Sequence, residues 1–228
     1  MYFKIKKNLD HFTVDLEYEF DQGVLVIQGE SGAGKTTILN CISGLTAPDW
    51  GRMSIEERVV FDSDEGIDLP ARTRKIGYLF QNYALFPNMT VHQNIIYGIK
   101  NKPEYREKEQ KDELLNYAED VMDTFGIAHL KKSHPDRISG GEKQRVALSR
   151  AIVTKPSLLL LDEPFSALDQ QTKEIVYQQF ASFKKNFQIP TILITHDARE
   201  SEMFADHHIL IKDGQIIEQN QKAQCSVL

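Results

Sequence analysis

The sequence predicts an α/β fold with a largely parallel core sheet. Three short aliphatic runs have the length of buried strands, at residues 24–27, 158–161 and 191–195. Three further segments carry apolar residues at helical spacing, at residues 35–43, 139–153 and 172–187. Strands that alternate with helices along a chain are typical of a parallel sheet covered by helices.

The remaining segments fit around this core. Residues 51–80 read as mixed strands and loops ending in a strand over 76–80, and Asp213-Gly214 between two aliphatic runs predicts a hairpin. Residues 88–130 read as a helical insertion with one apolar face, made of Leu114, Leu115, Ala118, Val121, Met122 and Phe125. On the helix over 172–187 we expect four residues to point inward: Ile175, Val176, Phe180 and Phe183.

Length, charge and hydropathy narrow the class of protein. The 228 residues suffice for one large domain, and a net charge of −6 with dispersed Lys and Arg argues against a broad nucleic-acid-binding face. No apolar run approaches the roughly 20 residues of a bilayer span, and no signal peptide is visible. Cys41 and Cys225 match no metal-ligand spacing and suggest a reducing compartment. We therefore expect a cytoplasmic protein that reaches a membrane only through a partner.

The segment 29–36 fits the phosphate-binding pattern G-x-x-x-x-G-K-[ST] between a predicted strand and a predicted helix. Its members are Gly29, Glu30, Ser31, Gly32, Ala33, Gly34, Lys35 and Thr36. Glycines let the backbone curl so that N–H groups face phosphate oxygens, and the helix adds its positive N-terminal end. We expect Lys35 to reach the β- and γ-phosphates, Thr36 to ligate Mg²⁺ and Thr37 to add a phosphate contact. A chance match is expected in roughly one chain in a hundred of this length.

Two acidic residues follow the strand over 158–161, and in a parallel sheet ligands sit at that edge. Asp162 is expected to hold Mg²⁺, and Glu163 to orient and polarise an attacking water. Taken alone, the pair could equally be a strand running into a polar turn. His196 follows the strand over 191–195, where it could contact the γ-phosphate and steady Glu163, or simply belong to a helix cap.

Together with Ser139-Gly140-Gly141, these residues resemble the ABC ATPase family. Six elements occur in the family's order: the loop at 29–36, Gln81, the signature at 139–141, the strand and acids at 158–163, Ser166-Ala167-Leu168-Asp169, and His196. The resemblance covers essentially the whole chain. It implies a phosphate-loop nucleotide hydrolase fold over 1–228, with a core over about 1–81 and 136–228, an antiparallel β subdomain, and a helical subdomain over about 82–135.

The resemblance also implies roles that the residues alone do not fix. The signature residues Ser139, Gly140 and Gly141 would contact the γ-phosphate held by a second copy of the chain, and Asp169 would lie across the same interface. Gln81 would touch Mg²⁺ and the attacking water. The implied ligands are ATP and Mg²⁺, and the implied catalytic residues are Lys35, Gln81, Glu163 and His196.

Three positions depart from the family's pattern or match it weakly. Ile138 stands where leucine is usual, and Glu142 stands where glutamine is usual, but the Ser-Gly-Gly core of the signature is retained. The segment before the phosphate loop is short. Phe12 is the nearest candidate there for the aromatic residue that stacks on adenine, and it could equally be a core residue.

Residues 81–91 and 161–169 are similar to those of bacterial importer ATPases for oxyanions, iron, polyamines and sugars, and residues 32–45 are closest to molybdate importer ATPases. Such relatives often carry a C-terminal regulatory domain, which we do not expect here because the sequence ends soon after the predicted hairpin. The implied partners are a second ATPase subunit, integral membrane permease subunits and an extracytoplasmic solute-binding protein. The implied location is the cytoplasmic face of a membrane.

Other functions stay open at this point. The main alternative is an exporter or lipoprotein-extraction ATPase. A soluble ABC ATPase of translation or DNA repair usually has two ATPase halves or a long coiled-coil insertion, and this sequence shows neither. A regulatory or scaffolding module without turnover predicts a lost Glu163 or a broken signature, and both are intact.

Overall fold

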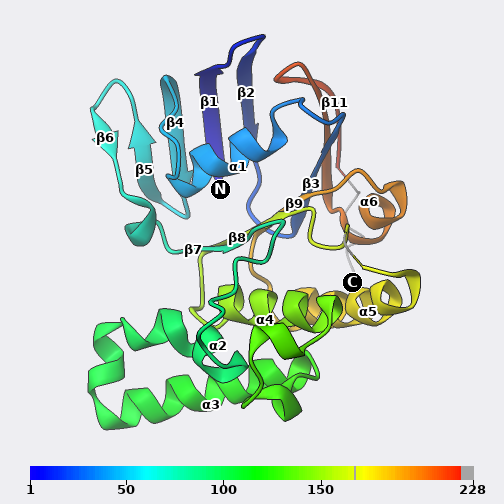
Figure 1. Ribbon diagram of the computed structural model, residues 1–228. Helices are drawn as coiled ribbons and strands as arrows, with labels where there is room; N and C mark the ends of the chain where they lie inside the picture. The colour runs from blue at the N-terminus through cyan, green and yellow to red at the C-terminus, as the bar shows by residue number, and fades with distance from the viewer. Residues whose placement is uncertain (167, 222–228) are drawn as a thin grey trace, which may run out of the picture.

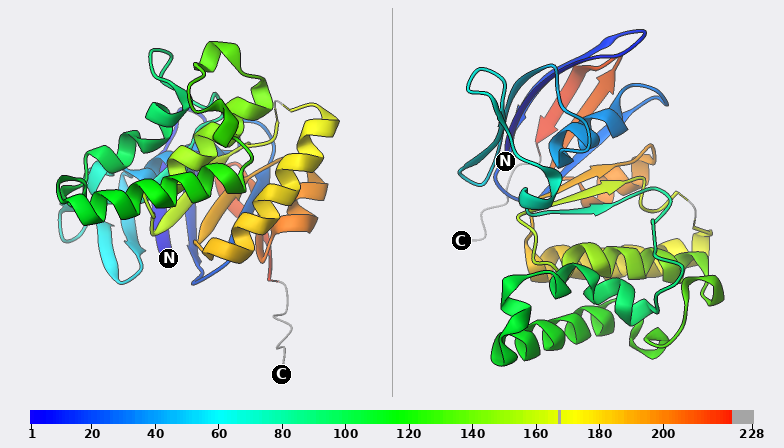
Figure 2. Two further views of the ribbon diagram at one scale, coloured as in Figure 1. Left: turned by 90° about the horizontal axis from the view of Figure 1, so that it is seen from below. Right: turned by 60° about the vertical axis from the view of Figure 1, so that its left-hand side comes forward.

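The described chain is built in three layers (Figure 1). The computed structural model describes residues 1–166 and 168–221, so Ala167 and Cys225 lie outside the described part. An antiparallel sheet forms one layer, a mostly parallel sheet the next, and a group of helices the third (Figures 1 and 2). None of the described helices has the length and apolar character that crossing a membrane requires.

The central sheet has the strand order β11-β10-β3-β9-β8-β7. Its strands are β3 (Val24–Gly29), β7 (Ile76–Leu79), β8 (Leu158–Asp162), β9 (Thr191–Ile194), β10 (His207–Lys212) and β11 (Gln215–Gln221). All neighbours from β10 to β7 pair in parallel, which confirms the predicted α/β core. The predicted hairpin joins β10 to β11, and its turn has positive φ at Asp213 (47°) and Gly214 (78°).

The second sheet is antiparallel, with the strand order β2-β1-β4-β5-β6. Its strands are β1 (Tyr2–Asn8), β2 (Thr13–Glu19), β4 (Trp50–Ile55), β5 (Arg58–Asp62) and β6 (Ile67–Asp68). We did not assign β1 and β2 from the sequence, although Phe3 and Ile5 alternate with lysines and are fully buried. That period of two is the signal that identifies a half-buried strand.

The helices occupy two places in the fold. They are α1 (Lys35–Ser43), α2 (Val91–Lys100), α3 (Lys108–Thr124), α4 (Gly140–Ile152), α5 (Gln170–Phe187) and α6 (Ala198–Phe204), with short 3-10 turns at η1 (Ala71–Thr73), η2 (Pro103–Arg106), η3 (Ala128–Leu130) and η4 (Pro135–Arg137). Helix α1 packs between the two sheets, whereas α2 and α3 lie beyond α4 in the helical layer (Figures 1 and 2). This confirms the predicted helical insertion between β7 and α4.

The three central strands β3, β8 and β9 are buried on both faces. Val26 and Leu193 pack into the cluster that contains the helical layer. Their neighbours Leu25 and Ile192 pack into a second cluster, which contains α1 and the antiparallel sheet. Burial on both sides explains why these strands read as continuous aliphatic runs without alternation.

One packing prediction is wrong. On α5, Val176, Phe180 and Phe183 are buried as expected, but the side chain of Ile175 is 47% exposed. Neighbouring residues on a helix are about 100° apart around its axis, so Ile175 falls beside the stripe that faces the sheet.

Helix α1 is held in place by one buried arginine. Arg74 lies just after η1 and donates from Nη1 to the carbonyls of Cys41 and Ile42, at 2.9 Å each, in the last turn of α1. Its Nε donates to the carbonyl of Leu69 at 2.7 Å, and its Nη2 pairs with Asp68 at 2.8 Å. Arg74 thereby supplies a donor to the carbonyl of Ile42, at a helix end whose last carbonyls lack intrahelical partners, and a second donor to the carbonyl of Cys41, which also accepts from the N–H of Gly44 at 3.2 Å.

We expect Arg74→Met to lower the free energy of unfolding by about 2–4 kcal/mol, because it removes the donor to the carbonyls of Ile42 in α1 and of Leu69. Urea denaturation would measure the change. Lys6→Met is the matched control, because Lys6 makes an exposed ion pair with Asp15 and such pairs contribute little. Equal stability of the Arg74 variant and the parent would show that Arg74 does not stabilise the end of α1.

Candidate active site

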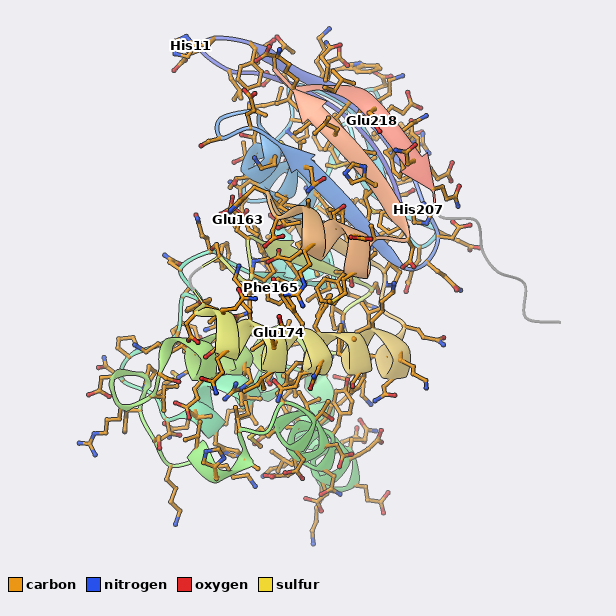
Figure 3. All side chains as sticks on the ribbon, turned by 90° about the vertical axis from the view of Figure 1, so that its right-hand side faces the viewer. His11, Glu163, Phe165, Glu174, His207 and Glu218 are labelled. Atoms are coloured by element: carbon orange, nitrogen blue, oxygen red, sulfur yellow. The ribbon has the colours of Figure 1, made fainter. Side chains whose placement is uncertain are left out.

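Four neighbouring strands end at the same edge of the central sheet and carry the candidate residues there. The phosphate-binding loop follows β3, and Asp162 ends β8. His196 lies two residues past the end of β9, and Gln81 lies two residues past the end of β7. Figure 3 shows Glu163 at this edge and His207, the first residue of β10, at the opposite end of the sheet. The carboxyl edge of a parallel sheet is where ligands bind.

The loop at 29–36 has the curled backbone that phosphate binding needs. Gly32 and Gly34 have positive φ, at 84° and 98°, and Gly34 is the N-cap of α1. A Cβ on Gly32 would have no atom within 4 Å, so this turn opens outward. Gly29 has a different reason to be glycine, because a Cβ there would lie 2.4 Å from the carbonyl oxygen of Ile211. The loop therefore combines an open turn with close packing on β10.

Lys35 is a buried cation in this loop. Its Nζ donates to the carbonyls of Gly29 and Glu30, at 2.7 Å each. Burial lowers the pKa of Lys35, and the carboxylates of Glu163 and Asp162 counteract this shift. A buried ammonium group beside an open turn of N–H groups is suited to an anion.

Thr36 and Asp162 form an oxygen pair next to Lys35. The hydroxyl of Thr36 donates to Oδ2 of Asp162 at 3.0 Å. Asp162 is only 6% exposed, and burial raises its pKa, although the Thr36 bond and Lys35 act in the opposite direction. A hydroxyl and a carboxylate are hard oxygen ligands of the kind that Mg²⁺ prefers.

Glu163 joins two other candidates. The amide nitrogen of Gln81 donates to Oε2 of Glu163 at 3.3 Å, and Nδ1 of His196 lies 3.6 Å from Oε1. Glu163 has a φ of 46°, a value that residues with a Cβ rarely adopt. Such strain is found at functional sites, where surrounding structure holds the residue.

A buried network behind His196 was not anticipated from the sequence. The hydroxyl of Thr195 donates to the carboxylate of Glu200, which is 2% exposed and also accepts from the Tyr177 hydroxyl at 2.7 Å. The N–H of Asp197 donates to the Thr195 hydroxyl at 3.0 Å. These bonds fix the turn that carries His196. A glutamate in the first turn of a helix gives no sequence signal of such burial.

The signature residues are engaged in a helix cap. Ser139 is the N-cap of α4, and its backbone N–H and hydroxyl both donate to Oε2 of Glu142, at 2.7 and 2.8 Å. These bonds lower the pKa of Glu142. Gly140 is open, with nothing within 4 Å of a Cβ, whereas a Cβ on Gly141 would lie 2.3 Å from a methyl carbon of Thr172. Gly141 thus has a packing reason to be glycine.

Asp169 and Phe12 lie apart from the cluster around Glu163. Asp169 caps α5, accepting from the N–H of Thr172 at 3.0 Å and from its hydroxyl at 2.7 Å. Phe12 is half-buried, and its ring lies 3.4 Å from where a Cβ on Gly34 would be. The ring is therefore next to the phosphate-binding loop and also packs on the core.

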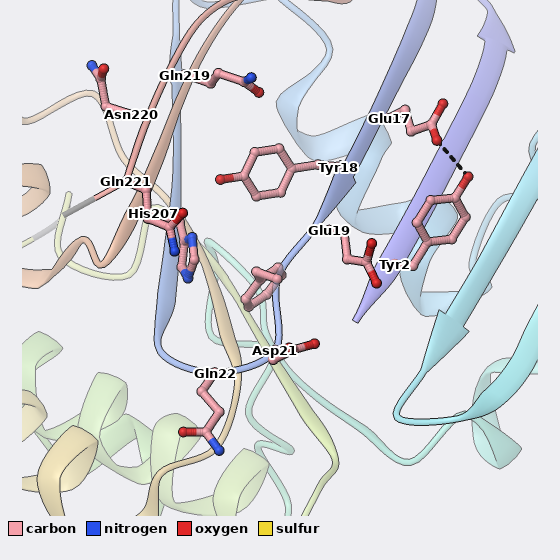
Figure 4. Close-up of a pocket in the computed structure, with 11 residues that line it drawn as sticks. Tyr2, Glu17, Tyr18, Glu19, Asp21, Gln22, His207, Gln219, Asn220 and Gln221 are labelled. Carbon is pink, nitrogen blue, oxygen red and sulfur yellow. Dashed lines mark hydrogen bonds between the residues drawn. The ribbon is translucent and has the colours of Figure 1, made fainter. Parts of the chain in front are cut away.

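The described surface also has a hollow away from this site. It measures about 820 Å³ and lies between the edge strands β2 and β11, beside Tyr18, His207 and Gln219 (Figure 4). The hydroxyl of Tyr2 in its wall is bonded to Glu17 at 2.9 Å. This gap lies where two sheet edges diverge, so its size carries no argument about chemistry.

Comparison with known proteins decides the family. Residues 14–166, more than half of the chain, match the family described as ABC transporter. The chain belongs to this family. Among ABC proteins of known structure, it is similar to a component of an ABC transporter complex of Clostridium perfringens, with a TM-score of 0.80, 26% identity, and coverage of 96% of this chain and 88% of that one. A dimeric bacterial ABC transporter cassette gives a TM-score of 0.78 at 25% identity, with coverage of 96% and 97%.

Two ABC relatives from sequence comparison are named as importer components. A molybdenum import ATP-binding protein of Rhodospirillum rubrum is 39% identical over 203 residues, which are 89% of this chain and 53% of that protein. A molybdate/tungstate import ATP-binding protein of Archaeoglobus fulgidus is 36% identical over 223 residues, which are 97% of this chain and 88% of that protein. The chain spans about half the length of the first of these relatives.

We expect Asp162→Asn to leave the nucleotide-free protein at least as stable as the parent at pH 7. The raised pKa means that the folded state binds this proton more tightly than the unfolded state, so the residue's contribution to stability falls as pH rises through the folded pKa. The amide of asparagine is uncharged, so burying it does not carry the cost of burying the Asp162 carboxylate. Thermal unfolding at pH 7 and at acid pH would measure the difference.

Asp169→Asn is the matched control, because the pKa shift of Asp169 and the expected change in stability at pH 7 both have the opposite sign. Hydrogen bonds from Thr172 lower the pKa of Asp169, so its contribution is present above the unfolded pKa and is lost as pH falls. We expect this variant to lose stability at pH 7. Clear destabilisation by Asp162→Asn at pH 7 would show instead that Lys35 compensates the buried charge.

Proposed function

We propose that the chain is an ATP-hydrolysing subunit that powers a membrane transporter. The observation that carries the proposal is the cluster at the sheet edge, where Glu163 contacts Gln81 and His196 beside the Thr36–Asp162 pair. The relatives named as import ATP-binding proteins support it.

The phosphate-binding loop is proposed to hold the triphosphate of ATP. Lys35 would exchange its bonds to loop carbonyls for the β- and γ-phosphates, because an anion compensates a buried ammonium group better than a carbonyl does. Backbone N–H groups of residues 29–36 and the N-terminal end of α1 add positive charge, and Thr37 adds a phosphate contact. Phe12, next to Gly34, is proposed to stack on the adenine ring.

Mg²⁺ would be held by Thr36, Asp162 and Gln81. The oxygen pair of Thr36 and Asp162 fits an ion that also takes substrate phosphates as ligands. When bound, the ion neutralises phosphate charge.

Hydrolysis requires a water aligned with the γ-phosphorus. We assign Glu163 to orient and polarise this water, with Gln81 holding one side and His196 contacting the γ-phosphate. The water oxygen bonds to the γ-phosphorus as the bond to the bridging oxygen breaks, giving ADP and phosphate. The strained backbone at Glu163 keeps the carboxylate aimed at the cluster before ATP arrives.

A second copy is proposed to complete each site. The exposed cap at Ser139 and Gly140 presents a hydroxyl and N–H groups at the N-terminus of α4, which suits the γ-phosphate of a partner. Gly141 would let the N-terminus of α4 approach the partner's γ-phosphate closely. Asp169 would lie at the same interface. The similar cassette solved as a dimer supports this arrangement.

The membrane partner is proposed to bind at residues 81–91. Two exposed aromatic rings, Phe86 and Tyr97, lie together there with centroids 4.7 Å apart. The same segment begins at Gln81, so contact with the partner connects directly to the hydrolysis site. We propose permease subunits as the partner, with the chain peripheral to the cytoplasmic face of the membrane, and an extracytoplasmic solute-binding protein in the complete importer.

The proposed cargo is a small oxyanion such as molybdate. The support is the naming of relatives that align over 89% and 97% of this chain. No residue of an ATP-hydrolysing subunit needs to touch the cargo, so co-purifying partners must identify it. If the co-purifying partners belonged to an exporter or a lipoprotein-extraction system, that assignment would replace import.

We expect Glu163→Gln to bind ATP normally and to reduce its hydrolysis by about a hundredfold or more, because the amide keeps the shape but loses the polarising charge. Phosphate release and nucleotide binding would measure the two properties separately. We also expect the variant to dimerise with ATP, as shown by size-exclusion chromatography. Turnover at the parent rate would exclude Glu163 from this role.

The same variant, purified from native membranes with ATP, tests the transporter assignment. Recovery of a polytopic membrane protein together with an extracytoplasmic binding protein supports import. Recovery of ribosomal or DNA-repair partners alone would overturn the assignment to a transporter, while the assignment as an ATP hydrolase would stand.

We expect Glu142→Gln to strengthen ATP-driven pairing. The carboxylate accepts the Ser139 hydroxyl and places a negative charge where the partner's γ-phosphate would bind. Glutamine removes the charge but keeps an acceptor for the cap. The ATP concentration at half-maximal dimerisation should fall severalfold. An unchanged or higher concentration would argue against Ser139 as the phosphate contact.

A further inference from the structure

The segment that carries Gln81 leaves β7 through two consecutive tight turns. The N–H of Tyr83 donates to the carbonyl of Phe80 at 2.9 Å, and the N–H of Ala84 donates to the carbonyl of Asn82 at 2.7 Å. The second bond closes a three-residue turn around Tyr83. Both Tyr83 and Ala84 have positive φ, at 61° and 43°. A three-residue turn with positive φ at its centre is the strained form, and neither residue is glycine.

One side chain from α4 clamps this strained pair. Arg150 donates from Nη1 to the carbonyl of Ala84 and from Nη2 to the carbonyl of Tyr83, at 2.8 Å each. Its guanidinium carbon also lies 5.3 Å from the centre of the Phe86 ring. In the described chain, both hydrogen bonds of the guanidinium end on this loop. A planar guanidinium holds two successive carbonyls in one fixed geometry, which the single rotatable ammonium group of a lysine does not impose.

The rest of the loop is anchored independently. Asn94 on α2 is fully buried, and its amide donates to the carbonyls of Phe86, Met89 and Thr90, at 3.1 Å each. It also accepts from the N–H of Phe86 at 2.8 Å. Removing the Arg150 clamp should therefore release the turns at 80–84 without unfolding the loop.

The clamped turns determine where Gln81 lies. Gln81 is the second residue of the first turn, and its amide reaches Glu163 at 3.3 Å. Arg150 sits in the last turn of α4, and Ser139 caps the first turn of the same helix. A single helix thus connects the signature cap to the loop that positions Gln81.

We propose that Arg150 is a positioning residue for ATP hydrolysis, which holds Tyr83 and Ala84 in their strained conformation and thereby sets Gln81 against Glu163. This inference rests on the proposed roles of Gln81 and Glu163. Arg150 touches neither ATP nor the attacking water; it acts through the loop.

The test compares Arg150→Ala, Arg150→Lys and the double variant Arg150→Ala/Ala84→Gly with the parent and with Ala84→Gly alone. We expect kcat to fall about tenfold or more in both single Arg150 variants, while KM for ATP changes little, because the strained turn relaxes. We expect Ala84→Gly to restore much of kcat in the Arg150→Ala background. Glycine adopts positive φ without steric cost, so the turn no longer needs the clamp.

Lys102→Ala is the matched control. Lys102 also donates to a backbone carbonyl across the helical layer, to Thr154 at 2.6 Å, but it does not contact the loop. We expect it to lower thermal stability without the fall in kcat. A fall in kcat that the Lys102 variant matches, or that Ala84→Gly does not relieve, would overturn the proposal and leave Arg150 a purely structural residue.

Two further variants separate failure of this inference from failure of the proposed function. If Glu163→Gln hydrolyses ATP at the parent rate, the catalytic roles are wrong and the inference falls with them. If Glu163→Gln is stalled but both Arg150 variants keep the parent kcat, only the inference is wrong. Gln81→Ala should match Arg150→Ala in kcat and should not respond to Ala84→Gly. If Ala84→Gly raised kcat in the Gln81→Ala background, the turn would affect hydrolysis without Gln81, and the proposal would be overturned.

Discussion

Parallel pairing of β3, β9, β8 and β7 is the constraint on which the candidate site depends. Strands that run in the same direction end at the same edge, so residues far apart in the chain meet there. Aliphatic side chains of these strands pack into the hydrophobic clusters on the two sides of the sheet. The positions of Lys35, Glu163 and His196 follow from the register of the strands, and a slip in one strand would separate them.

The same edge concentrates features that cost stability. Asp162 and Lys35 are buried charged groups. Burial raises the pKa of Asp162 and lowers the pKa of Lys35, and both shifts favour the neutral form of the group. Glu163 has a positive φ, and so do Tyr83 and Ala84 in the adjoining loop. Well-packed strands behind the edge can tolerate such costs, and functional sites are where proteins retain them. The neighbouring buried network around Glu200 likewise holds the turn before His196.

Helix α4 links the two ends of the proposed cycle. Its N-terminal cap at Ser139 is exposed, and the Ser139 hydroxyl is bonded to Glu142 of the same helix. In the proposed dimer, a partner's phosphate would replace this bond. Its last turn holds the loop that begins at Gln81. Contact with a membrane partner near Phe86 would act on the same loop from the other side.

The sequence by itself determined the α/β core and the helical insertion, and it predicted most members of the candidate site. The aliphatic runs, the glycine-rich loop and the acids after β8 are local patterns, and local patterns can be read without knowing the fold. The tertiary structure decided what depends on distant pairing or on orientation about a helix. The exposure of Ile175, the buried carboxylate of Glu200 and the Arg150 clamp are of this kind. Arg150 and Ala84 are 66 residues apart, and only the packing of α4 beneath the loop brings them together.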